Sequence, residues 1–484
     1  MSTALDSLSH KVQRAAVGTM VDVALAHVNK DRQKAIAEMV DVAKQFYGDS
    51  FSEETYEHAR TVLADPDSKW SKLISCVLSQ TDPNVARTTA LNLGYEAFFR
   101  GTKTIRENRV KYRCNIPWLI LFDPTSACNM HCVGCWAGEY GHKNNLSFED
   151  MDKIVTEGKA LGVYFYMLTG GEPLVRKADI LRLAEKHNDV QFAIYTNSTL
   201  IDEPFCEQVV KLGNIAFMLS IEGTPSTNDA RRGDGHYAAV MHAMDLLKAH
   251  GILFGTSICY TRDNLEAVTS DHFMRMLCDK GAHFGFYFHY MPVGNEAAPE
   301  LMPTPAQRKY MLERIRYLRS EKSDIPFYPM DFQNDGEFVG GCIAGGRNYF
   351  HINSAGDAEP LRLYPLLERQ HPRQQHPRHP PQPPLHGLSQ WAAFQQKPPA
   401  ALSDAGKSRA AAEDGPRHRC PQHGSAVPRD RRPPLRQVCG LCGRLAACGR
   451  RDLVSRHAPG EPVRELQGLE THHREMTLSV FPLE

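Results

Sequence analysis

Short apolar runs alternate with helix-patterned segments from residue 118 to residue 290 of this 484-residue chain. Six runs have the length and apolar character of buried strands: 118–122, 163–168, 191–195, 215–219, 252–259 and 283–290. The intervening segments have helical apolar spacing: 147–161, which opens on a Ser147/Asp150 capping-box pattern, 178–187, 203–212, 236–250 and 264–280. Alternating strands and helices imply a parallel sheet. The sequence therefore predicts an α/β fold, a partial (βα)6 TIM-type barrel with its chemistry at the carboxyl ends of the strands.

The segment before the first strand has a different pattern. Residues 1–113 are charged, Ala-rich and helix-patterned, with breakers at Asp65-Pro66 and Asp82-Pro83. They predict an N-terminal helical domain, which could cap the barrel and present substrate or serve as a plain scaffold. The segment lacks the uncharged apolar stretch of a signal peptide or a transmembrane segment.

Three cysteines follow the first strand at C-x3-C-x2-C spacing: Cys128, Cys132 and Cys135. Three thiolates on one loop can hold three irons of a [4Fe-4S] cluster and leave the fourth iron open to a substrate. A tetrahedral zinc site needs a second Cys or His pair, and none follows closely. The spacing therefore favours a cluster over structural zinc or a chance grouping of buried thiols.

Glycine, polar and charged residues stand after the next strands: Gly170, Gly171, Glu172, Pro173, Asn197, Ser220, Glu222 and Arg232. Paired glycines at a strand end let the backbone approach a ligand closely, and glutamate adds a carboxylate. Short polar groups at successive strand ends suit ribose hydroxyls and a carboxylate. Considered without the cysteines, the glycine stretch could be an ordinary turn. Arg232 could likewise belong to a basic turn exposed to solvent. At the end of the sixth strand, His289 and Tyr290 suit substrate contact and core packing equally.

Taken in order, these elements resemble the radical S-adenosylmethionine (SAM) superfamily. The resemblance implies that the three cysteines bind a [4Fe-4S] cluster, that the Gly-Gly-Glu-Pro stretch contacts the amino group of SAM, and that Arg232 approaches its carboxylate. It also implies that Asn197, Ser220 and Glu222 help to position SAM. The residue before the third cysteine is often aromatic in that family, whereas here it is Gly134, with Trp136 just after.

Beyond the barrel the chain resembles the SPASM or twitch subgroup of that superfamily. Its auxiliary-cluster motif, C-x9–15-G-x4-C, is matched by Cys342 and Gly356, and residues 347–357 are predicted to form a β-hairpin with a glycine turn. The second cysteine is due at position 361, which is Leu361. An auxiliary cluster at Cys342 is therefore expected only if the C-terminal reading frame is restored.

The composition changes at that same position. Residues 361–484 contain no Ile and no Asn, yet carry more than half of the chain's prolines. The segment is either a disordered, low-complexity tail or out of frame. Codons can be chosen for residues 360–370 so that a shift of one nucleotide gives Pro-Cys-Val-Phe-Ile-His-Tyr-Ser-Asn-Ala, which restores the cysteine. We favour the frame error, so Cys439, Cys442 and Cys448 are not predicted to be ligands.

These patterns divide the chain into four parts: 1–113 helical, 114–330 barrel, 331–360 the start of a SPASM-like domain, and 361–484 the tail. The formal net charge of zero gives no sign of a nucleic-acid partner. Thirteen cysteines without a secretory signal favour a reducing cytoplasm. The expected partners are a small-molecule, peptide or lipid substrate and a reductant such as flavodoxin or ferredoxin.

The predicted function is that of a radical SAM enzyme that cleaves SAM reductively to a 5′-deoxyadenosyl radical. This radical would abstract hydrogen from a peptide, a cofactor precursor or a lipid. Two other classes stay open. A non-catalytic iron-sulfur electron-transfer or binding protein would release no 5′-deoxyadenosine, and a helical scaffold would keep its activity without the cluster.

The frame error can be tested in the gene. Sequencing around codon 360 should find one extra cytosine in a cytosine run, and deleting it should encode cysteine at position 361 and permit an auxiliary cluster. A clean sequence whose related genes are read in the same frame would refute the frame error.

Overall fold

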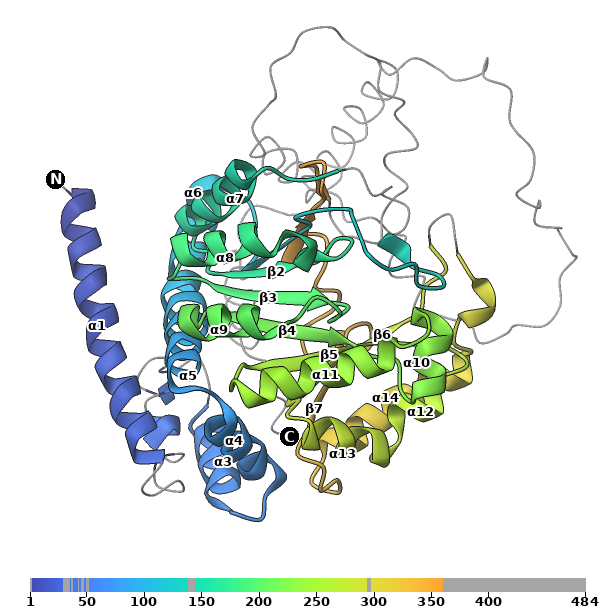
Figure 1. Cartoon of the computed structure of the whole chain (residues 1–484). Coiled ribbons are helices and arrows are strands. Elements are labelled where there is room, and N and C mark those ends of the chain that lie inside the picture. The colour runs from blue at the N-terminus through green and yellow to red at the C-terminus, as the bar shows by residue number, and fades with distance from the viewer. Residues whose placement is uncertain are drawn as a thin grey trace, which may run out of the picture. The chain divides into compact units, whose positions relative to one another are not determined.

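The computed structural model describes residues 2–28, 52–137, 144–293 and 297–359, with a few positions between 35 and 48. Within these residues the strands form one nine-stranded sheet of order β7-β6-β5-β4-β3-β2-β1-β8-β9 (Figure 1). The strands are β1 (Leu119–Phe122), β2 (Phe165–Leu168), β3 (Gln191–Thr196), β4 (Ile215–Ser220), β5 (Phe254–Tyr260), β6 (Phe284–His289), β7 (Tyr328–Asp331), β8 (Tyr349–Ile352) and β9 (Ala358–Glu359). Neighbours from β7 to β8 are parallel, and β9 is antiparallel to β8. The predicted α/β class and parallel sheet are confirmed.

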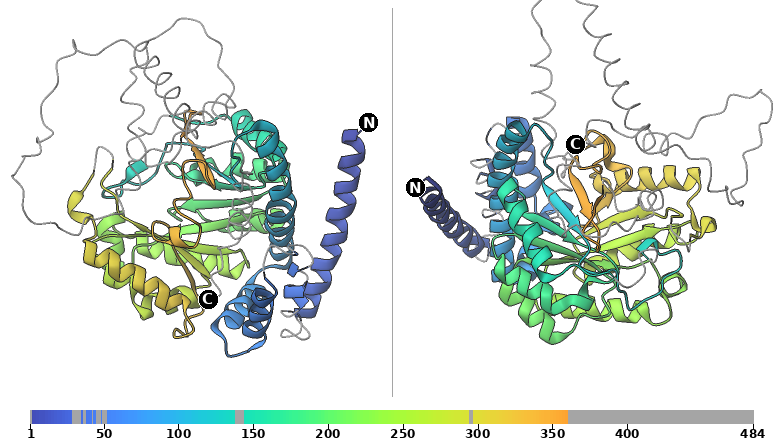
Figure 2. Two further views of the ribbon diagram at one scale, coloured as in Figure 1. Left: turned by 180° about the vertical axis from the view of Figure 1, so that it is seen from behind. Right: turned by 90° about the horizontal axis from the view of Figure 1, so that it is seen from above.

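The sheet is open, because β7 and β9 stand at opposite ends of the strand order. The predicted partial TIM-type barrel is therefore confirmed, and all six predicted strands are present. Helices cover the outer side of the curved sheet (Figure 2). They include α7 (Phe148–Leu161), α8 (Lys177–Lys186), α9 (Glu203–Leu212), α10 (Pro225–Arg232), α11 (His236–Ala249) and α14 (Pro305–Arg319). The predicted capping box opens α7, since Ser147 and Asp150 each bond the other's backbone N–H.

One predicted helix is divided in two. The segment 264–280 contains α12 (Leu265–Thr269) and α13 (Asp271–Asp279). Between them Ser270 has extended backbone (φ −67°, ψ 145°), and its side chain accepts the Phe273 N–H as the N-cap of α13. A serine that caps a new helix competes with continuation of the old one, which the apolar spacing alone does not reveal.

Three strands, β7, β8 and β9, extend the sheet beyond the six predicted strands. β7 contains Pro329, and a proline argues against a strand when only the sequence is known. Because β7 is an edge strand, it tolerates the missing N–H donor. The predicted hairpin is confirmed as β8 and β9, with Gly356 at φ +86° in its turn. In addition β8 pairs in parallel with β1, so the sheet continues past residue 331. The division at that residue stays a prediction, and the segment 361–484, which includes Cys439, Cys442 and Cys448, lies outside the described residues.

The N-terminal helices contact the loops that lead into the strands. They are α1 (Ser2–Val28), α3 (Glu53–Ala64), α4 (Lys69–Gln80), α5 (Pro83–Thr89), the π-helix η2 (Ala90–Gly101) and α6 (Thr102–Tyr112). Asn92 Nδ2 donates to the Val190 carbonyl at 2.9 Å, just before β3. The Asp82 N–H donates to the Gly251 carbonyl at 2.8 Å, before β5. These contacts place α5 and η2 at the amino ends of the strands, away from the predicted chemistry, and favour the scaffold interpretation.

A buried histidine and two carboxylates fasten the C-terminal hairpin to β1. Both ring nitrogens of His351 in β8 face carboxylate oxygens, Nε2 at 2.9 Å from Asp123 Oδ1 and Nδ1 at 2.9 Å from Glu359 Oε2. Asn353 Nδ2 donates to the other Glu359 oxygen at 2.8 Å. The Nδ1–Glu359 contact has hydrogen-bond geometry, whereas the Nε2–Asp123 contact is close but does not. The group therefore links β1, β8 and β9 through side chains as well as through the sheet.

We predict that His351→Ala lowers the free energy of unfolding by about 3–5 kcal/mol, because it leaves two buried carboxylates without their shared partner. Urea denaturation followed by circular dichroism measures the change. His272→Ala on the exposed face of α13 is the control and should change stability by less than about 0.5 kcal/mol. Equal effects of the two substitutions would contradict a stabilising role for the group.

Candidate functional site

The three cysteines lie on the loop that follows β1, and none of them forms a disulfide with another described residue. The pKa of the Cys128 thiol is raised to about 11, chiefly by burial and also by the charges of Glu172, Cys132 and Cys135, against a backbone hydrogen bond from Met130 that lowers it. Burial also raises the pKa of Cys132, while Arg232 and Arg231 oppose that rise. The thiols therefore lie close enough to affect one another, and bound iron would be needed to keep Cys128 and Cys132 deprotonated at neutral pH.

The predicted glycine loop packs directly on the cysteine loop. The Gly171 N–H donates to the Thr125 carbonyl at 2.9 Å, and the Glu172 N–H donates to the Ala127 carbonyl at 2.8 Å. A Cβ at Gly171 would stand 2.1 Å from the Ala127 carbonyl oxygen, and one at Gly170 (φ +125°) 2.3 Å from that of Thr125. The glycines thus permit a close approach of backbone to backbone, whereas the sequence suggested an approach to a ligand. In both cases only glycine fits.

Glu172 joins the ends of β2 and β3. Its carboxylate accepts from Thr196 Oγ1 at 2.7 Å, from the Asn197 N–H at 2.7 Å and from the Leu174 N–H at 3.0 Å. Burial raises the pKa of Glu172 to about 6, and these hydrogen bonds and the charge of Arg232 oppose the rise. Pro173 is buried at the first position of η4 (Pro173–Arg176), where it fixes the turn after the carboxylate.

Asn197 joins β3 to the cysteine loop. Its side-chain Nδ2 donates to Asn129 Oδ1 at 2.8 Å, and Asn129 lies next to Cys128. On its other side, His236 Nε2 lies 2.9 Å from the Asn197 carbonyl oxygen, while His236 Nδ1 lies 2.9 Å from Asn228 Nδ2. Burial lowers the pKa of His236 to about 4, so this ring is neutral at physiological pH and carries its proton on Nε2.

A buried carboxylate with two guanidinium groups forms the charged part of the site. Glu222 Oε1 accepts from Arg231 Nη1 at 2.7 Å and from Arg232 Nη2 at 2.6 Å. The Cys259 N–H donates to Glu222 Oε2 at 3.1 Å. Two cations on one anion leave a net positive charge beside the cysteine loop. Because the Val133 N–H donates to the Arg231 carbonyl at 2.8 Å, the loop is also held to α10 by its backbone.

The structure brings together most of the predicted site residues and adds others. Glu172 contacts Asn197, and Glu222 contacts Arg232, whereas Ser220 is half-buried at the end of β4. Sequence reasoning missed the role of Arg231, although it is adjacent to Arg232. It also passed over Ser198, which has φ +73° and a buried hydroxyl with no hydrogen-bond partner among the described residues. A non-glycine residue at positive φ is a signal that only coordinates provide.

Aromatic rings fill the barrel below these strand ends. Tyr287 points outward, since its hydroxyl donates to the Val268 carbonyl of α12 at 2.8 Å. Its neighbours in β6 therefore face inward. The inward Phe288 ring lies 6.3 Å from Tyr195 of β3 and 5.1 Å from Phe332, which follows β7. Such a filled interior makes an apolar floor under the polar strand ends.

The donor set of the loop fits an iron-sulfur cluster. Three thiols of one short loop face a positively charged group that can balance the negative charge of thiolates. In the part of the chain that the structure describes, no group of three or more His, Cys, Asp and Glu side chains is arranged to hold a metal ion. That finding concerns a single ion, whereas the ligands of a four-iron cluster stand farther apart.

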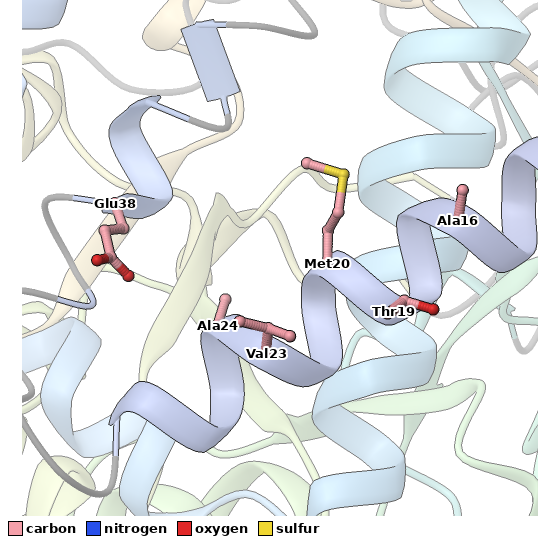
Figure 3. A pocket seen from close by; sticks show the side chains of 6 residues that line it. All are labelled: Ala16, Thr19, Met20, Val23, Ala24 and Glu38. Carbon is pink, nitrogen blue, oxygen red and sulfur yellow. The ribbon is translucent and has the colours of Figure 1, made fainter.

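A groove lies along α1, away from this site. It is lined by five residues of α1 and by Glu38: Ala16, Thr19, Met20, Val23 and Ala24 (Figure 3). α1 is fastened to η2 by Arg14 Nη1, which donates to the buried Glu96 at 2.8 Å.

Among the described helices, none is both long and apolar enough to cross a membrane.

Residues 122–271 match the sequence model of the Radical SAM superfamily. This range starts at the end of β1 and includes the three cysteines, the glycine loop and the Glu222 group. The chain therefore carries a radical SAM domain, and the superfamily predicted from the cysteine spacing is confirmed.

Named relatives match parts of the chain. It is 33% identical over 161 residues to an uncharacterized protein of Archaeoglobus fulgidus, a match that covers 32% of this chain and 38% of that protein. It is 23% identical to an AdoMet-dependent heme synthase of Methanosarcina barkeri (52% and 79% covered) and 29% identical to the mycofactocin maturase MftC of Mycobacterium ulcerans (50% and 67% covered). The chain thus spans well under half of the first of these relatives.

Among solved structures, the Streptococcus suis protein SuiB bound to S-adenosylmethionine is similar, with a TM-score of 0.47 and 17% identity. That match covers 56% of this chain and 66% of SuiB.

We predict that Gly171→Ala destabilises the protein by about 1–3 kcal/mol, because the new Cβ would overlap a backbone carbonyl that cannot rotate away. Gly94→Ala is the matched control, since a Cβ there meets nothing within 4 Å. Denaturant unfolding of both variants gives the comparison. A Gly171→Ala protein as stable as Gly94→Ala would show that the two loops are not packed as described.

Proposed function

We propose that this protein is a radical SAM enzyme that cleaves SAM at a [4Fe-4S] cluster held by Cys128, Cys132 and Cys135. One observation carries the proposal: backbone hydrogen bonds join the cysteine loop both to the glycine loop and to the helix that bears Arg231 and Arg232. These three elements lie within the range that matches the superfamily, and together they supply cluster ligands and a polar, positively charged surface.

Cys128, Cys132 and Cys135 would hold the cluster, which, when bound and reduced, would supply the electron for cleavage of SAM to methionine and the 5′-deoxyadenosyl radical that takes hydrogen from the substrate. The residues of the chain bind and orient SAM. Two guanidinium groups on Glu222 leave one positive charge for the SAM carboxylate. Glu172 already accepts three hydrogen bonds, and a carboxylate can accept about four, so it can still receive the amino group.

The hydroxyls of Ser198 and Ser220 and the amide of Asn197 suit the ribose. Ser198 Oγ is buried and lacks a partner among the described residues, which makes it the better prepared of the two hydroxyls. Gly170, Gly171 and Pro173 act on SAM indirectly, because they fix the path of the backbone between β2 and Glu172.

The substrate class stays broad. The relatives carry names as different as heme synthase, Fe-coproporphyrin III synthase and mycofactocin maturase, so a cofactor precursor, a peptide and a lipid are all retained. The electron would come from a carrier such as flavodoxin or ferredoxin. The exposed Cys342 before the β8–β9 hairpin supports a SPASM or twitch-type extension, whose auxiliary cluster would need the restored reading frame.

The test is SAM cleavage under anaerobic conditions. Reconstituted protein should hold about four irons per chain and, with dithionite and SAM, release 5′-deoxyadenosine detectable by mass spectrometry. Cys132→Ala should abolish both, because two thiolates retain a cluster poorly. Cys76→Ala on α4 is the control and should preserve both.

Iron without 5′-deoxyadenosine would favour the alternative function, a non-catalytic iron-sulfur protein for binding or electron transfer. Full iron content in Cys132→Ala would refute the ligand assignment.

A further inference from the structure

The cysteine loop has a glycine where a side chain would meet a ring from another part of the barrel. Gly134, between the second and third cysteines, has φ +64°. A Cβ built on it would lie 2.4 Å from the Tyr290 hydroxyl oxygen and 2.8 Å from two carbons of that ring. Tyr290 follows β6, more than 150 residues farther along the chain. The ring therefore occupies the space beside the loop that a side chain at position 134 would need.

The ring is held firmly in this place. Tyr290 is only 2% exposed. Its backbone N–H donates to the Tyr260 carbonyl at 2.9 Å, and its hydroxyl accepts the Ala298 N–H at 2.9 Å. The ring thus joins the end of β6, the segment at Ala298 and the cysteine loop. A tyrosine that only filled the barrel core would not need to end against Gly134, the one residue from Cys128 to Cys135 that has no side chain.

We propose that Tyr290 is a positioning residue for the cluster-binding loop: its ring supplies from β6 the aromatic surface that the loop lacks at Gly134, and so fixes the directions of Cys132 and Cys135. The role of this contact in cluster binding rests on the proposed function. The contact itself concerns the loop, with or without iron. The sequence left substrate contact and core packing open for Tyr290. The proposed role is a form of packing, in which the ring supports the cysteine loop.

The loop can be tested without iron through its thiols. In the metal-free, reduced protein, Tyr290→Ala should make Cys132 and Cys135 react with iodoacetamide about tenfold faster, which corresponds to about 1.4 kcal/mol of lost contact. Tyr290→Phe keeps the ring but removes the hydroxyl that accepts the Ala298 N–H, so its labelling rate should rise less than that of Tyr290→Ala. Cys76 on α4 is an internal control, because its labelling rate should be the same in all variants if the fold is intact.

A double-mutant cycle makes the test specific to the pair. Gly134→Ala should raise the labelling rate in the wild-type background, where the new Cβ meets the ring. In the Tyr290→Ala background the same change should have a clearly smaller effect. After anaerobic reconstitution, iron per chain should fall in Tyr290→Ala and be retained in Tyr290→Phe.

Unchanged labelling of Cys132 and Cys135 in Tyr290→Ala would overturn the proposal, and so would additive effects of the two substitutions. Failure of the proposed function gives a different result. In that case the wild-type protein takes up no iron, while the labelling rates still decide whether the ring holds the loop.

Discussion

The site depends on a close contact between two pieces of backbone. The glycine loop after β2 donates two backbone hydrogen bonds, of 2.9 Å and 2.8 Å, to carbonyls of the cysteine loop after β1, and the absence of Cβ atoms at Gly170 and Gly171 makes this approach sterically allowed. From there Glu172 reaches the end of β3. The carboxyl ends of three adjacent parallel strands are thereby tied into one surface that carries the thiols.

A charged group, Glu222 with Arg231 and Arg232, lies on the other side of the cysteine loop. Glu222 is fully buried, and a buried carboxylate is costly unless it is paired. Two arginines of α10 pair with it, and the carbonyl of one of them accepts a hydrogen bond from the cysteine loop. The arginines therefore serve two purposes: they neutralise Glu222 and leave an excess positive charge near the thiols. That excess suits both thiolate ligands and a carboxylate-bearing cofactor.

Local patterns were enough to predict the six barrel strands, the capping box of α7 and the hairpin after Tyr349. The cysteine spacing likewise predicted the superfamily. Some of what sequence reasoning missed is local, such as the Ser270 cap between α12 and α13, and the rest depends on contacts between separate elements of the fold. The pairing of Arg231 with Glu222, the His351 group across β1, β8 and β9, and the ring of Tyr290 against Gly134 each join segments whose proximity only the folded chain defines. β7 was not predicted because its proline argues against a strand unless the strand is known to lie at the edge of the sheet.

The central claim is that the loop after β1 holds an iron-sulfur cluster beside the Glu222 group. The most direct test is a crystal structure of the anaerobically reconstituted protein with SAM, with anomalous scattering recorded at the iron absorption edge. We expect iron density bound to the thiols of Cys128, Cys132 and Cys135, with the SAM carboxylate near Arg231 and Arg232. Absence of iron from that loop, or iron held by other cysteines, would contradict the claim.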